Sequence, residues 1–258
     1  MSRTLSVCII AHNEEPKLAR TLESVSFADE IILVDCESTD GTAAAAQRFK
    51  ARVFQRPNLA NLNVNKNYSF DQAVSDFILC LDADEVVPPA TAEEMRITIS
   101  ENPAQNGFFL PRRNYFLGHW LKHGGQYPDW QLRLFRRGRG RFPEKHIHER
   151  LEVEGAVGRL KNPLDHFTYE SLEECERKLD FYTTFEAQAL HLQGIKPSPI
   201  TACRFLYWTP GQRFVRRYLL KLGFLDGAAG WLAMRQDLRN FRLRYRKLVS
   251  LHELHQGD

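Results

Sequence analysis

Three acidic side chains directly follow an apolar segment in the first third of the chain. Residues 79–87 read Leu-Cys-Leu-Asp-Ala-Asp-Glu-Val-Val, so the apolar run ends in Asp82, Asp84 and Glu85. Clustered carboxylates repel one another and are costly to desolvate, which favours a bound cation at this point. Oxygen ligands without nearby thiolates favour Mg²⁺ or Mn²⁺, often shared with a diphosphate. The alternative is a solvated acidic turn that binds nothing.

Short apolar runs alternate with segments of helical spacing over the first hundred residues. Strands are expected at residues 5–11, 30–35, 52–55 and 77–81, with helices beginning near Pro16, Thr42 and Asn63. This alternation indicates an α/β fold with a doubly wound, mostly parallel sheet. Ligands bind outside the carboxyl ends of the strands in such sheets. Those ends carry His12-Asn13-Glu14, Asp35 and Asp82-Ala83-Asp84.

The sequence contains neither GxGxxG nor GxxxxGK[ST], the two glycine-rich phosphate motifs. A bound diphosphate would therefore need a metal ion and basic side chains. Arg133 and Arg136 are the candidates for holding phosphate groups, because arginine pairs well with phosphate oxygens. The alternative is that they belong to a solvated basic strand.

The second half of the chain predicts a binding region followed by helices. A helix is expected at 92–100 and a strand at 107–112, and the aromatic and polar stretch 113–141 is typical of binding loops. A further helix should begin near Ser171 and end near Leu192. We therefore expect a catalytic domain at residues 1–193 and a helical, basic extension at residues 194–258.

Composition is that of a soluble globular protein, with 43% hydrophobic and 26% charged residues. No run of 18 apolar residues occurs, so no transmembrane helix is expected, and the first residues lack a secretory cleavage site. The five cysteines have no metal-ligand spacing, and Cys8 and Cys80 lie in apolar strands. These features predict a cytoplasmic protein with reduced thiols.

The end of the chain is strongly basic. Residues 204–247 contain eleven lysine and arginine side chains but only two acidic ones, Asp226 and Asp237. Apolar and aromatic residues interleave with these charges, which is typical of an element that lies on an anionic membrane surface. We therefore expect peripheral association with the inner membrane. An amphipathic helix packed on the catalytic domain is the alternative, and nucleic acid is not expected as a partner.

Several ordered motifs resemble those of family 2 glycosyltransferases, which have the GT-A fold. They are Ser6–Glu15, Val34-Asp35 with Ser38–Thr42, and Leu81–Glu85. Later segments are similar to the bacterial branch that adds glucose or a similar sugar to the lipopolysaccharide inner core. These segments are Gly124-Gly125, Asp129–Arg136, His146–Glu149 and Phe224–Gly227. The resemblance covers nearly the whole chain.

The resemblance implies how a nucleotide sugar would be bound. Asn13 and Glu14 would lie beside the nucleotide, and Asp35 would recognise the uracil edge. Lys66 and Asn67 would approach the nucleotide from the third helix.

It also implies roles for the acidic motif. Asp82 would contact the ribose and Asp84 would hold the divalent metal, Mg²⁺ or Mn²⁺, with Asp82 as a second ligand and Glu85 in support. His146, His148 or His166 could supply a further ligand, although packing or acceptor contact is the alternative for these histidines.

Asp129 occupies the position of the family's acidic catalytic base. The acidic residue that usually precedes it is replaced by Pro128, and Glu149 is the alternative base. A carboxylate within hydrogen-bond reach of the acceptor hydroxyl is what such a reaction requires.

These observations predict an inverting, metal-dependent transfer of a hexose, glucose in the first place, from a UDP-sugar to a lipopolysaccharide core or related glycolipid. A sugar-nucleotide pyrophosphorylase is one alternative, although it would need a glycine-rich loop where His12-Asn13-Glu14-Glu15 stands. A non-catalytic membrane-docking protein that retains the fold is the other.

Overall fold

A computed structural model describes residues 3–59, 61–145 and 149–254. They form two compact units. The first comprises the chain up to Arg112 together with Asp129–His166, and the second comprises Arg113–Pro128 together with the chain from Phe167 onward. The predicted boundary between residues 193 and 194 lies inside the second unit, and as a functional division it stays a prediction.

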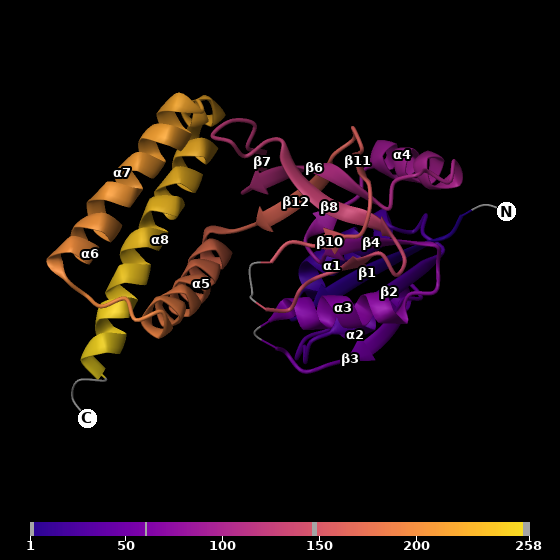
Figure 1. Ribbon diagram of the computed structural model, residues 1–258, viewed down its shortest axis with the longest axis horizontal. Helices are drawn as coiled ribbons and strands as arrows, with labels where there is room; N and C mark the ends of the chain where they lie inside the picture. The colour runs from indigo at the N-terminus through magenta and orange to yellow at the C-terminus, as the bar shows by residue number, and fades with distance from the viewer. Residues whose placement is uncertain (1–2, 60, 146–148, 255–258) are drawn as a thin grey trace. The chain divides into compact units, whose positions relative to one another are not determined.

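Four parallel strands form one half of the sheet in the first unit (Figure 1). Their order is β3-β2-β1-β4, with β1 at Leu5–Ala11, β2 at Glu30–Asp35, β3 at Arg52–Gln55 and β4 at Phe77–Asp82. They are connected by the helices α1 (Glu15–Ser24), α2 (Thr42–Arg48) and α3 (Leu62–Gln72). Ala11 pairs with Asp35, and Ile10 pairs with Asp82. The acidic strand ends therefore meet at one edge of the sheet.

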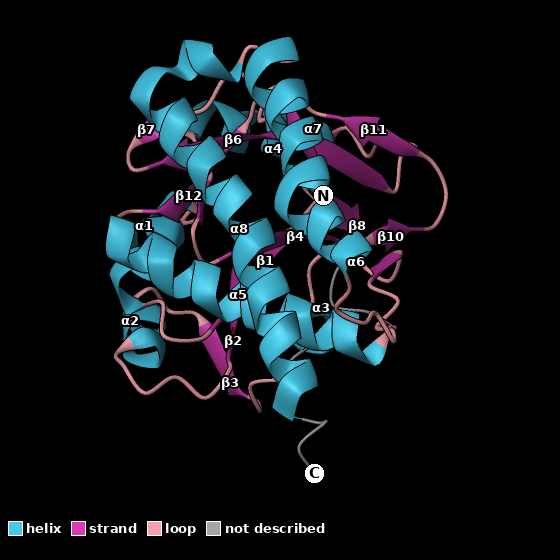
Figure 2. Ribbon diagram, turned by 90° about the vertical axis from the view of Figure 1, so that its left-hand side faces the viewer, coloured by secondary structure: helices cyan, strands magenta, loops and turns pink. Residues whose placement is uncertain are grey.

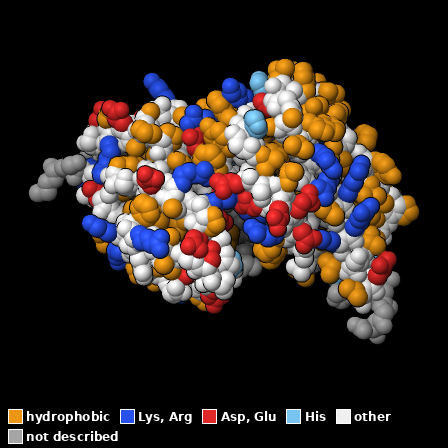
Figure 3. Space-filling model, turned by 180° about the vertical axis from the view of Figure 1, so that it is seen from behind, with side chains coloured by type: hydrophobic (Ala, Val, Ile, Leu, Met, Phe, Trp, Pro, Cys, Tyr) orange, Lys and Arg blue, Asp and Glu red, His pale blue; other side chains and the backbone are white. Residues whose placement is uncertain are grey.

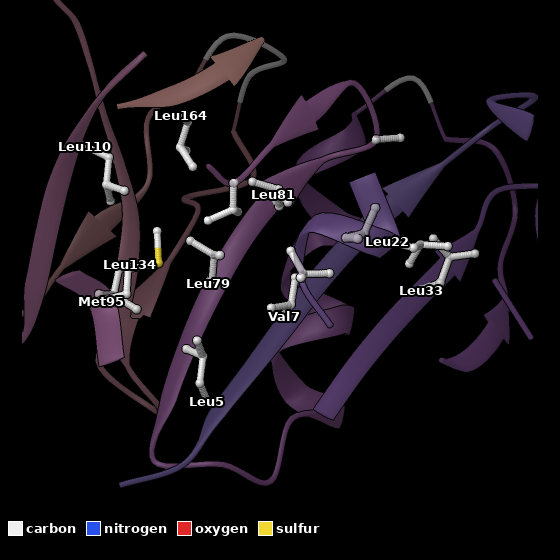
Figure 4. Packing of buried hydrophobic residues seen from close by; sticks show 14 of the residues in the cluster. Leu5, Val7, Leu22, Leu33, Leu79, Leu81, Met95, Leu110, Leu134 and Leu164 are labelled. Atoms are coloured by element: carbon white, nitrogen blue, oxygen red, sulfur yellow. The ribbon is translucent and has the colours of Figure 1, made fainter. Parts of the chain in front are cut away.

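Both faces of the parallel strands are covered, as their continuous apolar runs predict. On one face Leu5, Val7 and Ile9 pack with Leu18 and Leu22 of α1, in the cluster that Figure 4 shows. The opposite face carries a second apolar cluster that includes Cys8, Ile32, Phe70, Ile78 and Cys80. Because strand side chains alternate between faces, each strand contributes to both layers.

The other half of the sheet is largely antiparallel. β4 pairs with β8 (Asp129–Arg136), which pairs in turn with β6 (Gly107–Phe116). β5 (Glu85–Val86), β11 (Val157–Arg159) and β12 (Leu164–Tyr169) also belong to this half, whereas β9 (Gly140–Arg141) and β10 (Glu152–Val153) form a separate two-stranded sheet. Helix α4 spans Pro89–Ser100. The end of β6 and the whole of β8 fall within the stretch 113–141, which was predicted to consist of binding loops. That prediction is wrong for residues 113–116 and 129–136. The aromatic residues obscured the strand pattern there.

The second unit is mainly helical (Figure 2). Its elements are β7 (His119–Trp120), α5 (Leu172–Leu192), α6 (Pro199–Cys203), α7 (Thr209–Phe214), α8 (Gly227–Leu254), two π-helical segments (Arg204–Trp208 and Val215–Leu220) and a 3₁₀ turn (Gly223–Asp226). The expected helix from Ser171 to Leu192 is confirmed. The Ser171 hydroxyl accepts a hydrogen bond from the Glu174 backbone N–H at 3.0 Å, a typical N-cap.

Ion pairs join α8 to α5 within this unit. Arg239 pairs with Glu176, and Lys247 Nζ lies 2.6 Å from Asp180 Oδ1. Part of the positive charge of the C-terminal segment therefore faces acidic side chains of α5. Among the described residues, no helix combines the length and the apolar character needed to cross a membrane.

Candidate active site

The candidate site lies at the carboxyl ends of β1, β2 and β4. Asp35 ends β2 and Asp82 ends β4, on either side of β1. Neighbouring strands lie about 4.8 Å apart, so these two aspartates are separated by about 10 Å. That span suits a nucleotide placed across the end of β1.

Asp35 is almost completely buried and is held from two directions. One carboxylate oxygen accepts a hydrogen bond from the Gln55 side-chain amide at 2.9 Å, and the other accepts one from the Ser38 backbone N–H at 3.3 Å. These bonds fix the orientation of the carboxylate at the strand end. The arrangement is consistent with a group that reads the edge of a base by hydrogen bonding.

The loop after β1 is fixed to the loop after β2. Asn13 has a left-handed backbone (φ 54°), and its side-chain oxygen accepts a hydrogen bond from the Thr39 N–H at 2.8 Å. Glu14 donates its backbone N–H to Thr42 Oγ1 at 3.0 Å, and its carbonyl begins α1. The structure therefore brings Asn13, Glu14 and Asp35 to one edge, as the sequence predicts.

Asp82 is engaged by two cations. Lys66 Nζ lies 2.7 Å from Asp82 Oδ1, and the Arg133 guanidinium donates to Oδ2. Burial by itself would raise the pKa of Asp82, but the positive charges of Arg133 and Lys66 outweigh it and hold the pKa well below its ordinary value. Burial likewise acts to lower the pKa of Lys66, and the charge of Asp82 overcomes it and raises that pKa. Asp82 is thus a fixed anion.

Glu85 lies at the centre of this charge network and is fully buried. One of its oxygens accepts hydrogen bonds from Arg133 at 2.7 Å and from Arg112 at 3.0 Å. The other accepts the Asp82 backbone N–H at 3.0 Å, which ties the acidic turn together. Two arginines satisfy a carboxylate that would be very costly to bury alone. Glu85 therefore stabilises the acidic turn from its buried side.

Asp84 lies beside a histidine, whereas Asp82 and Glu85 contact lysine and arginine side chains. Its Oδ1 lies 3.4 Å from His166 Nε2, and both side chains are mostly but not fully buried. His166 is on β12, which pairs with β5 directly after the acidic turn. His146 and His148 lie outside the described residues. Of the predicted histidine ligands, His166 is thus the one that the described structure places beside Asp84.

Asp129 lies at the start of β8, directly opposite Arg112 of β6. Its Oδ2 accepts two hydrogen bonds from Arg112, at 2.9 and 2.7 Å, and its Oδ1 accepts one from Gln131 at 2.8 Å. Asp129 and Gln131 share one face of β8, because side chains alternate along a strand. The pairing with β6 is irregular at the next residues, where Phe109 pairs with Leu132 and Phe108 with Leu134. This face carries the candidate base, and Arg112 connects it to Glu85 and so to the network around Asp82.

Arg112 was not identified from the sequence. It is the last residue of a predicted strand, and a single arginine there carries no local signal of function. Burial acts to lower its pKa, but Glu85 and Asp129 outweigh that effect and raise it. The alternation of Asp129 and Gln131 with Trp130 and Leu132 was a signal that could have located the polar face at the start of β8.

Three predicted site residues have other surroundings. Asn67 is buried and exchanges hydrogen bonds with the backbone of Phe142, with N–O distances of 2.9 Å. Its amide therefore secures a loop to α3. Glu149 accepts hydrogen bonds from the Lys145 backbone N–H at 2.7 Å and the Asn63 amide at 3.3 Å, near the start of α3.

Arg136 lies apart from the acidic turn. Because β8 runs antiparallel to β4, Arg136 pairs with Phe77, at the beginning of β4. Five residues of strand separate Phe77 from Asp82, a distance of about 17 Å. Its guanidinium donates to the Pro103 carbonyl at 2.9 Å. Arg136 therefore lies away from the acidic turn, whereas Arg133 lies within the network, and contact of either arginine with a donor or acceptor phosphate stays a prediction.

The second unit joins two of the later sequence motifs. Asp226 accepts hydrogen bonds from the backbone N–H groups of Lys122 and His123, and its Oδ1 lies 2.7 Å from His123 Nδ1. Gly124 donates its N–H to the Lys221 carbonyl at 2.8 Å. The segment around Gly124-Gly125 is thus anchored by the turn that contains Asp226.

Comparison of the sequence with known proteins identifies the family of the chain. A family model described as "Glycosyl transferase family 2" matches residues 6–157, which include the strand ends and the acidic turn. The chain belongs to glycosyl transferase family 2. Its glycosyltransferase relatives include LpsC of Rhizobium meliloti, a lipopolysaccharide core biosynthesis glycosyltransferase, at 30% identity over 88% of this chain and 85% of that protein. An uncharacterized glycosyltransferase of Rickettsia conorii is 26% identical over 97% of this chain and 93% of its own length.

Comparison with solved structures bears on the fold. The structure of S. aureus TarS 1–349 in complex with UDP matches 99% of this chain and 92% of that chain, with a TM-score of 0.51 and 15% identity. The predicted GT-A fold with a C-terminal helical region is thereby confirmed. At this identity the likeness concerns the fold alone.

Proposed function

We propose that this family 2 glycosyltransferase transfers a hexose, glucose in the first place, from a UDP-sugar to a lipopolysaccharide core or related glycolipid, with inversion at the anomeric carbon. The observation that carries the proposal is the acidic turn Asp82–Glu85, which lies at the same sheet edge as Asn13 and Asp35. The lipopolysaccharide core function of the Rhizobium relative supports the acceptor class. The UDP bound to TarS supports the choice of nucleotide.

A divalent metal ion fits the residues of the acidic turn. Asp84 offers a carboxylate beside His166, and both Asp82 oxygens already accept from cations. Among the described residues, no group of three or more His, Cys, Asp or Glu side chains could hold a metal ion by itself. Mg²⁺ and Mn²⁺ sites of this kind complete their coordination with substrate phosphates and water. Asp84 would therefore be the principal protein ligand, and Asp82, the predicted second ligand, would share its oxygens with Lys66 and Arg133.

The protein contributes charge and position to the reaction. When bound, the metal ion would neutralise the charge that develops on the leaving diphosphate. Lys66 and Arg133 hold Asp82 in a fixed place for the ribose, and Asp35 orients the base. Asp129 would accept the proton of the acceptor hydroxyl as that oxygen attacks the anomeric carbon. Glu149 is the alternative base.

Calorimetric titration with UDP tests the donor site directly. We expect binding in Mn²⁺ that is lost in EDTA and lost or strongly weakened in Asp84→Asn. Glu154→Gln is a suitable control, because Glu154 is an exposed carboxylate whose ion-pair partner, Arg139 in the turn before β9, is also exposed. Equal binding of UDP in EDTA and by Asp84→Asn would exclude the acidic turn as the metal and nucleotide site.

Release of UDP from UDP-glucose then separates the two candidate bases. Asp129→Asn should lower the rate by about 10²- to 10⁴-fold, the usual contribution of a general base. Glu149→Gln should change it little, since Glu149 is held at the start of α3. The opposite pattern would transfer the role of base to Glu149.

We also propose that the helical unit associates with the cytoplasmic face of the inner membrane. Tyr207 and Trp208 are exposed on the first π-helical segment, and Leu219, Leu220 and Arg216 are exposed on the second. Figure 3 shows apolar side chains gathered over part of the helical unit with basic side chains nearby. Aromatic and basic residues together favour the interface of an anionic membrane, where a glycolipid acceptor would be found.

Sedimentation with lipid vesicles tests the membrane proposal. We expect binding to vesicles of phosphatidylcholine and phosphatidylglycerol, weaker binding to phosphatidylcholine alone, and loss of binding in Trp208→Ser/Leu220→Ser. Leu192→Ser is the matched control, because Leu192 is 86% exposed but belongs to α5. Undiminished binding by the double variant would exclude this surface.

A further inference from the structure

Arg112 connects the candidate base to the acidic turn. It ends the part of β6 that belongs to the first unit, opposite Asp129 of β8. Its Nε and Nη2 both donate to Asp129 Oδ2, and its Nη1 donates to Glu85 Oε1 at 3.0 Å. One guanidinium therefore holds carboxylates from two different strands.

The geometry of a guanidinium makes this contact directional. Its N–H groups lie in a rigid plane, so three hydrogen bonds to two carboxylates fix the position of both. Gln131, on the same face of β8, holds the other oxygen of Asp129. The Asp129 side chain nevertheless remains 30% exposed, so it is accessible from solvent while its orientation is restricted.

Glu85 extends the connection to the turn itself. Its second oxygen accepts the Asp82 backbone N–H, and Asp84 is the residue next to it in sequence. Arg112 and Glu85 thus link the Asp129 carboxylate to the acidic turn through side-chain hydrogen bonds. Glu85 would keep Arg133 as a partner without Arg112, whereas Asp129 would lose the two hydrogen bonds that Arg112 donates to it.

We propose that Arg112 is a positioning residue for glycosyl transfer, acting through Asp129. This inference rests on the proposed function and assigns a role to a residue outside the predicted site. In the reaction, a bond forms between the acceptor oxygen and the anomeric carbon as the bond to the diphosphate oxygen breaks. The proton of the acceptor hydroxyl passes to Asp129, and the bonding electron pair leaves with UDP. Arg112 holds the receiving carboxylate at a fixed place relative to the acidic turn.

A double-mutant cycle distinguishes this role from a purely structural one. UDP release from UDP-glucose is measured for the wild type, Arg112→Gln, Asp129→Asn and the double variant, and UDP affinity is measured for each by calorimetry. We expect Arg112→Gln to lower kcat by about 10- to 100-fold, since a small misplacement of a reacting group can cost about 100-fold. UDP affinity and the donor KM should change by less than about threefold, because the interaction serves the reacting proton and not donor binding.

The decisive comparison is made in the Asp129→Asn background. If Arg112 acts through Asp129, adding Arg112→Gln there should lower kcat by no more than about twofold, because residues that act as a unit are non-additive. Arg112→Lys keeps a cation for Glu85 and should recover part of the rate. Arg52→Gln is the control, because Arg52 forms its ion pair on β3, near the opposite end of the sheet.

Each contrary outcome contradicts one claim. Full additivity in the double variant, or an unchanged kcat in Arg112→Gln, overturns the role of Arg112. An unchanged kcat in Asp129→Asn also overturns the role of Arg112. If that variant still binds UDP, the proposed donor site is unaffected by this result. A wild-type protein that neither binds UDP nor releases it from any UDP-hexose contradicts the proposed function itself.

Discussion

Replacing Arg133 with glutamine should destabilise the protein strongly, because Arg133 is the buried cation shared by two carboxylates. Its side chain is 7% exposed, and it donates to Asp82 and to the fully buried Glu85. Glutamine retains similar polarity but carries no charge and reaches less far. The substitution therefore removes charge while creating only a modest cavity.

The expected decrease in the free energy of unfolding follows from the contacts that remain in Arg133→Gln. Removing one partner of a buried ion pair costs about 3–5 kcal/mol when the other charge is left alone. Here Asp82 keeps Lys66 and Glu85 keeps Arg112, so the loss lies toward the lower end, about 3 kcal/mol. Because domains are stable by about 5–15 kcal/mol, the variant should still fold.

The difference in stability between the wild type and Arg133→Gln should also depend on pH. A carboxylate with a lowered pKa stabilises the folded state fully above its unfolded pKa, about 4 for aspartate, and loses that effect as the pH falls through its folded pKa. Without Arg133 the pKa of Asp82 should return toward its ordinary value. The stability gap between wild type and variant should then be constant from about pH 7 to 5 and narrow below about pH 4.

Urea denaturation followed by circular dichroism measures both effects. The midpoint should fall in Arg133→Gln with little change in the slope of the transition. Arg52→Gln, which removes a more exposed ion pair, should cost no more than about 1 kcal/mol. A gap below about 1 kcal/mol at neutral pH, or one that widens below about pH 4, would refute the reasoning about this network.

Three further predictions concern the two units separately. Leu79→Ala, in the fully buried part of β4, should lower the free energy of unfolding by about 3–5 kcal/mol in a urea titration, whereas a cost below about 1 kcal/mol would contradict its place in the core. Ser171→Ala should cost about 1 kcal/mol by loss of the α5 cap, and Ser171→Asp should restore most of it in the same measurement. Asp226→Ala should destabilise the loop at Lys122–Gly124, so limited proteolysis should cut there sooner than in the wild type, and equal cutting would contradict the anchoring role.

Local sequence was sufficient for much of the fold. The apolar runs at 5–11, 30–35 and 77–82 are buried on both faces, which is why continuous hydrophobicity predicted parallel strands there. Helix α5 was predicted from about Ser171 to Leu192, and the Ser171 cap that begins it depends on residues close in sequence. Asp35 and Asp82 could be placed at one edge because parallel strands present their carboxyl ends together.

The antiparallel half of the sheet was less accessible to such reasoning. β8 was expected to be a loop, since its aromatic and charged residues mask the alternation that marks a half-buried strand. Its register against β4 and β6 is set by contacts between residues distant in sequence. Register decides that Arg133 meets Asp82 while Arg136, three positions further on, lies at the opposite end of β4.

The sequence by itself therefore determined the family, the parallel strands and the acidic turn, because each depends on neighbouring residues or on a spacing that strand geometry converts directly into position. Only the tertiary structure decided which cations meet those acids. Lys66, Arg112 and Arg133 come from one helix and two strands, and each joins the network through a contact across 16 or more residues of sequence. Burial makes each cation necessary, since a carboxylate such as Glu85 can be fully enclosed only where positive charge surrounds it.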